Sequence, residues 1–71
     1  MHIEGKLLLL SGKCPDVSFF IATTLVNASK STSYSDGKCG DLRAGTSVEV
    51  DGARQSNGSV NAIQIDINRE D

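Results

Sequence analysis

Both cysteines of this 71-residue chain lie in the same short motif, Gly-Lys-Cys-x-Asp, which occurs at residues 12–16 and again at residues 37–41. Paired cysteines can bind a metal ion, exchange electrons or cross-link the chain. A structural zinc ion needs four nitrogen or sulfur ligands, whereas this chain offers Cys14, Cys39 and a single histidine, His2. A redox Cys-x-x-Cys pair is also absent from the sequence. The pattern therefore favours a disulfide between Cys14 and Cys39, with two free thiols as the alternative.

The repeated motif does not indicate an internal repeat. Aligning its two copies sets Val17 against Leu42, but the same shift sets Leu7 against Thr32. Glycine, proline and aspartate are ordinary loop residues, so turn chemistry explains the similarity. We expect each cysteine to lie in a turn between strands.

A disulfide would matter in a domain this small. We expect one β-barrel domain over residues 1–71, with its core at about residues 3–67. Apolar residues make up 38% of the chain and aromatic residues 4%, and a core of this size rarely supplies more than roughly 3–5 kcal/mol. Closing a loop of about 25 residues adds roughly 3–4 kcal/mol in the chain-entropy model. A disulfide in turn predicts an oxidising compartment.

Catalytic residue sets are not evident in the sequence. His2 is the only histidine and is expected to be a solvent-exposed residue at a frayed end, and the serines lack a partnering base. The aspartates do not follow the spacing of a calcium loop. We predict a non-catalytic protein without a metal or cofactor.

The charge pattern narrows the choice of partner. Seven basic and nine acidic residues are spread along the chain, so the basic footprint of a nucleic-acid-binding protein is missing. Leu8 and Leu10 have the parity of outward-facing residues, and Phe20 and Tyr34 are candidates for exposed aromatic side chains. These four residues are the predicted ligand or partner face. The partner would be a protein or a glycan, and the chain itself a monomer or weak homo-oligomer.

Short alternating stretches separated by glycine, asparagine and aspartate are typical of a small β-sandwich or barrel. No window shows helical periodicity. The expected strands cover residues 3–10, 17–22, 23–26 and 32–35, followed by one helical turn at residues 41–45 that Gly45 closes.

A C-terminal hairpin is the clearest expected element. Asn57-Gly58 predicts a type I′ turn, in which both central residues have positive φ. The resulting register pairs Val48 with Ile67, Glu49 with Asp66, Val50 with Ile65 and Gly52 with Ile63. Val60 and Ala62 then have the opposite parity, so we expect either a β-bulge near Asn61-Ala62 or a Val60 that only caps the hairpin tip.

The sequence contains no apolar run of membrane-spanning length, since the longest is the four-leucine run Leu7 to Leu10. It also opens directly on a strand-like pattern rather than on a signal peptide. A cytosolic protein fits these observations, as does a mature domain cut from a longer exported chain, with Met1 added. The cysteines favour the second interpretation.

The order of several short motifs resembles that of a bacterial family, the domain of unknown function DUF5666. The resemblance extends from about Ile3 to Ile67. Its motifs, in chain order, are G-K-L from Gly5, G-x-C-P from Gly12, F-x-I from Phe19, T-S-Y from Thr32, G-x-C-x-D-L from Gly37, G-T-x-V-E-V-x-G from Gly45 and N-G-S-V-x-A from Asn57.

This resemblance implies an OB-like small β-barrel in an exported bacterial protein, located in the periplasm, at the cell surface or outside the cell. Domains of the family are found as repeated modules of lipoproteins and surface proteins, and no activity or site residues transfer from them. We therefore expect a five- to six-stranded antiparallel OB-like barrel, acting as a binding or spacer module. The alternative is an OB-type domain that binds oligonucleotides or oligosaccharides near Phe20 and Tyr34, and a third possibility is a protein-interaction edge at Leu8 and Leu10.

Overall fold

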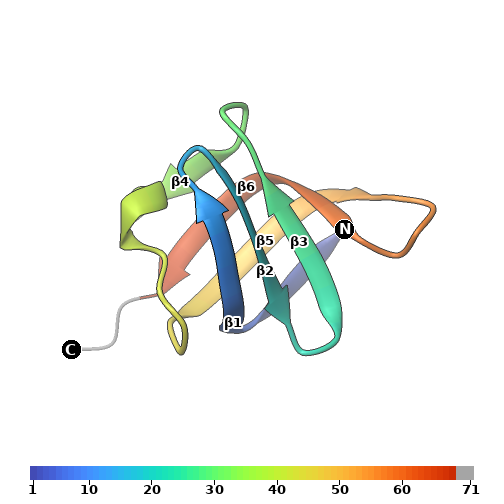
Figure 1. Cartoon of the computed structure of the whole chain (residues 1–71), viewed down its shortest axis with the longest axis horizontal. Coiled ribbons are helices and arrows are strands. Elements are labelled where there is room, and N and C mark those ends of the chain that lie inside the picture. Colours follow the sequence, from blue (N-terminus) through green and yellow to red (C-terminus); the bar gives the residue numbers. More distant parts are fainter. Residues whose placement is uncertain (69–71) are drawn as a thin grey trace.

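The computed structural model describes residues 1–68, which form a small all-β barrel with one short 3₁₀ turn (Figure 1). In chain order the elements are β1 (His2–Lys13), β2 (Asp16–Ile21), β3 (Thr24–Ala28), β4 (Ser33–Ser35), η1 (Cys39–Asp41), β5 (Ser47–Arg54) and β6 (Val60–Asn68). The predicted all-β class and barrel are confirmed. Within the described residues, no helix is long and apolar enough to cross a membrane.

Five strands close the barrel in the order β3-β2-β1-β5-β6, and a pairing between β6 and β3 completes the ring. The long strand β1 makes this possible because its first half pairs with β5 and its second half with β2. Strand β4 lies outside the ring and adds to β6. Figure 1 shows β4 and η1 together on one flank, with the β5–β6 loop on the opposite flank.

The prediction of an entirely antiparallel sheet is wrong at two pairings. Strands β3 and β6 run parallel, with Val26 beside Val60, and β4 and β6 also run parallel, with Tyr34 beside Ile65. A ring with an odd number of strands cannot alternate direction at every neighbour, so closing five strands leaves one parallel pair. The sheet is therefore mixed.

The barrel interior is filled by alternate residues of the five ring strands, together with one residue from the segment after η1. Phe19 is the largest fully buried side chain, and the expected inward set Val17, Phe19 and Ile21 is confirmed. The buried apolar residues are Leu7, Val17, Phe19, Ile21, Val26, Ala28, Leu42, Val48, Val50, Val60, Ala62, Ile65 and Ile67.

The β5–β6 hairpin has the predicted register near its open end, where Val48 pairs with Ile67, Glu49 with Asp66 and Val50 with Ile65. Nearer the turn, however, Gly52 pairs with Ala62 and not with Ile63. The register shifts between Asp51 and Gly52, which leaves Ile63 as the extra residue of a β-bulge and 62% exposed. A bulge was expected at Asn61-Ala62; it lies one residue later and turns Val60 and Ala62 inward.

The turn of this hairpin is not the predicted type I′. Gly58 has a φ of 88°, but Asn57 does not have a positive φ. The Gly58 N–H donates to the Gln55 carbonyl oxygen at 3.0 Å, while Asn57 Oδ1 accepts hydrogen bonds from the Ser59 N–H at 3.0 Å and the Ser59 hydroxyl at 2.6 Å. The asparagine side chain thus stabilises a longer loop, and only the glycine needs the left-handed conformation.

The helical turn comes earlier than the expected residues 41–45, because η1 covers Cys39–Asp41. The Asp41 carboxylate accepts a hydrogen bond from the Lys38 N–H at 2.8 Å, which caps the start of the turn. Gly45 instead ends the following loop, where its N–H donates to the Leu7 carbonyl oxygen at 2.7 Å. This bond attaches the loop to β1.

Candidate functional site

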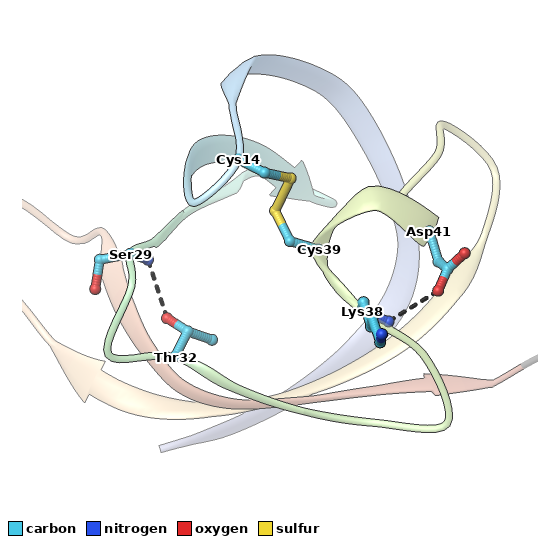
Figure 2. Close-up of a disulfide and its surroundings, with 6 residues drawn as sticks. All are labelled: Cys14, Ser29, Thr32, Lys38, Cys39 and Asp41. Carbon is cyan, nitrogen blue, oxygen red and sulfur yellow. Dashed lines mark hydrogen bonds between the residues drawn. A yellow bond between two sulfur atoms is a disulfide. The ribbon is translucent and has the colours of Figure 1, made fainter.

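The two cysteines form the predicted disulfide. Cys14 lies in the turn between β1 and β2, Cys39 begins η1, and their Cα atoms are 6.0 Å apart (Figure 2). Neither cysteine is free. Cys39 is half-buried and packs against the core, so the bridge joins a turn of the barrel to the segment that crosses between β3 and β5. The cysteines therefore form a structural cross-link.

The crossing segment, residues 29–46, needs such an attachment because only the three residues of β4 join the sheet. Two other contacts assist. The buried Thr32 hydroxyl donates to the Ala62 carbonyl oxygen at 2.7 Å and accepts from the Ser29 N–H at 3.0 Å (Figure 2). Leu42 is buried in the core. Thr32 thus attaches the chain to the barrel just before β4, and the disulfide and Leu42 attach it at η1 and just after.

Three apolar side chains form a row across the outer face of β1, β2 and β3. Leu8 pairs with Phe20, and Phe20 pairs with Leu25. Directly paired residues of antiparallel strands project from the same face, and the neighbours of Phe20 in β2 point into the core. Leu8 is 44% exposed, while Phe20 and Leu25 are half-buried. We call Leu8, Phe20 and Leu25 the outer apolar row.

The row ends at an irregularity in β1. Leu8 pairs with Phe20 but Ser11 pairs with Ser18, so β1 contains one extra residue between these pairs. Leu9 lies at this bulge with a φ of 53° and is 75% exposed, and Leu10 is also exposed. A leucine in the left-handed region is strained by roughly 1–2 kcal/mol. Leu9 therefore combines backbone strain with an exposed apolar side chain, two features that do not favour stability.

Replacing Leu9 by glycine is expected to raise the free energy of unfolding by about 0.5–1 kcal/mol, because relief of the strain exceeds the added entropy of the unfolded chain. Leu8→Gly is the matched control. Leu8 has ordinary extended backbone in the same strand, so its replacement should destabilise by about 0.5–1 kcal/mol. Urea denaturation followed by circular dichroism measures both variants. A loss of stability in Leu9→Gly would contradict the strain argument.

Tyr34 does not join Leu8 and Phe20 on one face. It lies beside the buried Ile65, is half-buried itself and packs against the core, whereas Phe20 points outward. The sequence pattern of 32–35 was too short to determine the facing of Tyr34, which depends on the parallel pairing with β6. Its hydroxyl oxygen is buried without a hydrogen-bond partner in the described part of the chain, and burial raises the pKa of Tyr34.

Tyr34→Phe is expected to leave the free energy of unfolding unchanged or to raise it by up to about 1 kcal/mol, because the variant removes a buried hydroxyl that has no partner. Thr32→Val is the matched control. It removes a buried hydroxyl that does have partners, so a loss of about 1 kcal/mol is expected. Thermal and urea denaturation measure both. A clear loss in Tyr34→Phe would show that its hydroxyl is satisfied in solution.

Besides the outer apolar row, a group of polar side chains lies on the outer face of β1 and β5. Its members are His2, Glu4, Glu49 and Asp51. His2 is not a frayed end: it pairs with Asp51 in the ladder, and Glu4 pairs with Glu49. His2 Nδ1 is 2.7 Å from Asp51 Oδ1, and His2 Nε2 is 3.5 Å from Glu49 Oε1. The sequence alone could have shown that His2 and Glu4 lie on the same face of a strand, because they are two residues apart. It could not show that β1 pairs with β5, which brings Glu49 and Asp51 to them.

The pKa of His2 is raised above the ordinary value of 6.5, chiefly by the hydrogen bond to Asp51 and further by the charges of Asp51, Glu49 and Glu4. Protonation of His2 therefore favours the folded state. This contribution is fully present below the unfolded pKa of 6.5 and disappears as the pH rises through the folded pKa. An NMR titration of the His2 ring should give a pKa above 6.5, and Asp51→Asn should lower it. An unshifted pKa in the native chain would contradict the contact.

The fold and the cross-link together define a small, disulfide-bonded β-barrel domain. The chain belongs to the family described as Domain of unknown function (DUF5666), whose model matches residues 15–66. The suspected family is thus confirmed, on a match that contains Cys39, most of the β5–β6 hairpin and most of the core, and that begins one residue after Cys14. No curated protein matches the chain, and no solved structure matches it either.

Proposed function

We propose that this chain is a non-catalytic binding module of an exported bacterial protein, built as an OB-like barrel. The OB-fold is a five-stranded Greek-key barrel that binds ligands on the face of its second and third strands. Three features support this assignment: the long β1 that pairs with two strands, the parallel closure of β3 with β6, and the crossing segment between β3 and β5.

The outer apolar row is the observation that carries the binding proposal. It lies on β1, β2 and β3, so it includes the face that OB-folds use. The exposed and strained Leu9 adjoins it. Backbone strain and exposed apolar surface both cost stability, and proteins retain such features mainly at sites of interaction. A module that served only as a spacer would have no use for them.

The row favours a protein partner with an apolar surface of its own. Beside it on β2 and β3, Ser18 donates to Asn27 Oδ1 at 2.7 Å, so its immediate neighbour is an uncharged polar pair. Phosphate recognition requires arginine or lysine side chains along the binding face. The row itself is uncharged, and the net charge of the chain is −2.

A second candidate function is an OB-type domain for oligonucleotides or oligosaccharides. The outward-facing Phe20 favours it, because bases and sugar rings stack on such aromatic side chains. Tyr34 is half-buried against the core and does not extend this platform. Phe20 alone would have to supply the stacking.

Titration of the ¹⁵N-labelled chain separates these possibilities. Three kinds of ligand are tested: apolar and aromatic peptides selected for binding to this chain, single-stranded oligonucleotides at low salt, and short oligosaccharides. A protein-binding module should show peptide-induced shifts at Leu8, Phe20 and Leu25, and Phe20→Thr should weaken the peptide at least about tenfold. The matched control is Ile63→Thr, which removes an exposed isoleucine from β6 and should leave binding unchanged.

Each other outcome has a definite meaning. Salt-dependent oligonucleotide binding, or saccharide binding, that is lost in Phe20→Thr would support the second candidate instead. Peptide binding that is equally weakened by Ile63→Thr, or the absence of shifts along the outer apolar row, would overturn the binding proposal and leave a spacer.

The disulfide supports export, because such bonds persist in oxidising compartments. We expect the native bacterial protein to be recovered from the periplasmic or surface fraction with Cys14 and Cys39 oxidised. Thiol labelling of fractionated cells measures this. Free thiols in a cytoplasmic fraction would overturn the localisation without affecting the binding test.

A further inference from the structure

The outer face of β1, β5 and β6 carries a row of three carboxylates. Glu4 pairs with Glu49, and Glu49 pairs with Asp66. Like charges that are directly opposite in a sheet destabilise it. Within residues 1–68, none of these carboxylates has a lysine or arginine partner, and the ion pairs of this face are the two made by His2. Among the described residues, a protonated His2 is therefore the only ion-pair partner of this carboxylate row, through its contact with Glu49.

The single imidazole of the chain lies among these carboxylates. One ligand atom each from His2, Glu4 and Glu49 can be chosen so that all three lie within 4.8 Å of one another. All three side chains are at least partly exposed, so an ion can reach them from solvent. One nitrogen and two oxygens at this spacing can surround a single ion after small side-chain movements.

Asp51 gives the imidazole a defined orientation. Its carboxylate binds His2 Nδ1 at 2.7 Å, which leaves Nε2 directed toward Glu49 at 3.5 Å. Metal-binding histidines commonly donate their second ring N–H to a carboxylate in this manner, which fixes the tautomer and raises the basicity of the ligand nitrogen. Asp51 is not one of the three candidate ligands, so its contact is a separate feature of the site.

We propose that His2, Glu4 and Glu49 bind one divalent transition-metal ion of the zinc class, and that Asp51 orients His2 for this purpose. An imidazole with two carboxylates suits zinc, whereas calcium and magnesium prefer oxygen ligands alone. A shallow depression lined by Glu4, Gly5, Ser47, Val48 and Asn68 adjoins the site. Coordination positions that the protein does not fill remain open to water or to a further ligand from this side.

This site is separate from the outer apolar row. The two share β1, but Leu8, Phe20 and Leu25 lie over β1–β3 and the proposed metal ligands over β1 and β5. Metal binding would replace a repulsion between carboxylates by attraction to the ion, so zinc should also stabilise the folded chain. The two proposals can therefore fail independently.

Calorimetric titration of the full chain with Zn²⁺ at neutral pH tests the site. We expect saturable 1:1 binding and a rise in Tm with zinc concentration. His2→Ala and Glu49→Gln should each weaken binding at least about tenfold, and Asp51→Asn about tenfold through loss of orientation. Binding should weaken as the pH falls through the His2 pKa, since the ion and a proton compete for the ring. The groups that face His2 are Asp51, Glu49 and Glu4.

Asp16→Asn is the matched control because it removes one negative charge from an exposed position that pairs with Lys13, at the opposite end of β1 from His2 and Glu4. It should change zinc affinity by no more than about twofold, since screening limits such distant effects. Equal weakening by Asp16→Asn, or equal affinity for Ca²⁺, would show diffuse charge attraction and overturn the proposal. Weakening by His2→Ala without any by Glu49→Gln would place the ion at the N-terminal amine and His2, and would also overturn it. NMR shifts of the His2 ring confirm the binding position.

Discussion

Replacing both cysteines by serine, Cys14→Ser with Cys39→Ser, is expected to lower the free energy of unfolding by about 3–4 kcal/mol. The bridge closes a loop with a sequence separation of 25 and so restricts the unfolded chain. In the folded state it anchors a crossing segment whose only strand is β4, Ser33–Ser35. A barrel of this size holds only roughly 3–5 kcal/mol without such help. The variant should therefore remain folded at room temperature, with roughly half the stability of the oxidised chain.

Urea denaturation followed by far-ultraviolet circular dichroism measures this effect. Reduction of the native chain is the control. A thiol reductant should lower its free energy of unfolding to that of the double variant, and should not change the stability of the variant itself. Amide hydrogen exchange followed by NMR under native conditions is a second measurement. Amides near Leu42 should lose their protection from exchange first, because Leu42 packs into the core from the anchored segment. Equal denaturation midpoints for oxidised and reduced protein would contradict the structural role of the bridge.

Gly52→Ala is expected to destabilise the barrel by about 3 kcal/mol, the upper part of the range for forced overpacking. A Cβ at this position would lie against the Asn61 carbonyl oxygen and 2.7 Å from Val60 Cγ1. Backbone at the β-bulge opposite cannot move aside without breaking the β5–β6 ladder. The Gly52 N–H and carbonyl also bond the Met1 carbonyl oxygen at 2.9 Å and the Met1 amino group at 2.8 Å. A shift of β5 would loosen the start of β1 as well.

Gly40→Ala is the matched control, since a Cβ on Gly40 has no atom within 4 Å. Gly40 lies in η1, and its replacement should change the free energy of unfolding by no more than about 0.5 kcal/mol. Urea denaturation of the two variants gives the comparison directly. Similar stabilities for Gly52→Ala and Gly40→Ala would show that the barrel tolerates a methyl group at the bulge.

The register of the β5–β6 hairpin was predicted only in part. Its distal register was predicted correctly, although the assumed turn was wrong and the Gly52–Ile63 pair does not form. The loop shifts the register by one residue, and the bulge at Ile63 shifts it back. Both irregularities serve the same constraint, because Val60, Ala62, Ile65 and Ile67 must all reach the core. Burial of these side chains determined the register more strongly than the turn did.

Predictions about faces were less successful. Val17, Phe19 and Ile21 alternate within one strand, so their common facing follows from the period of two. Leu8 and Phe20 belong to neighbouring strands and do form one row. Tyr34 was grouped with them on residue type alone, yet its facing depends on β4 pairing in parallel with β6. No local pattern in a three-residue strand can predict that pairing.

The sequence by itself therefore determined the all-β class, the family, the disulfide partners and the inward residues Val17, Phe19 and Ile21 of β2. These properties depend on composition, motif order and local alternation, which are present in a linear chain. Only the tertiary structure decided the parallel closure, the outward row of Leu8, Phe20 and Leu25, and the meeting of His2 with Glu49. Each of these depends on which strands become neighbours when five strands close into a ring, and that choice is made by the packing of the whole core.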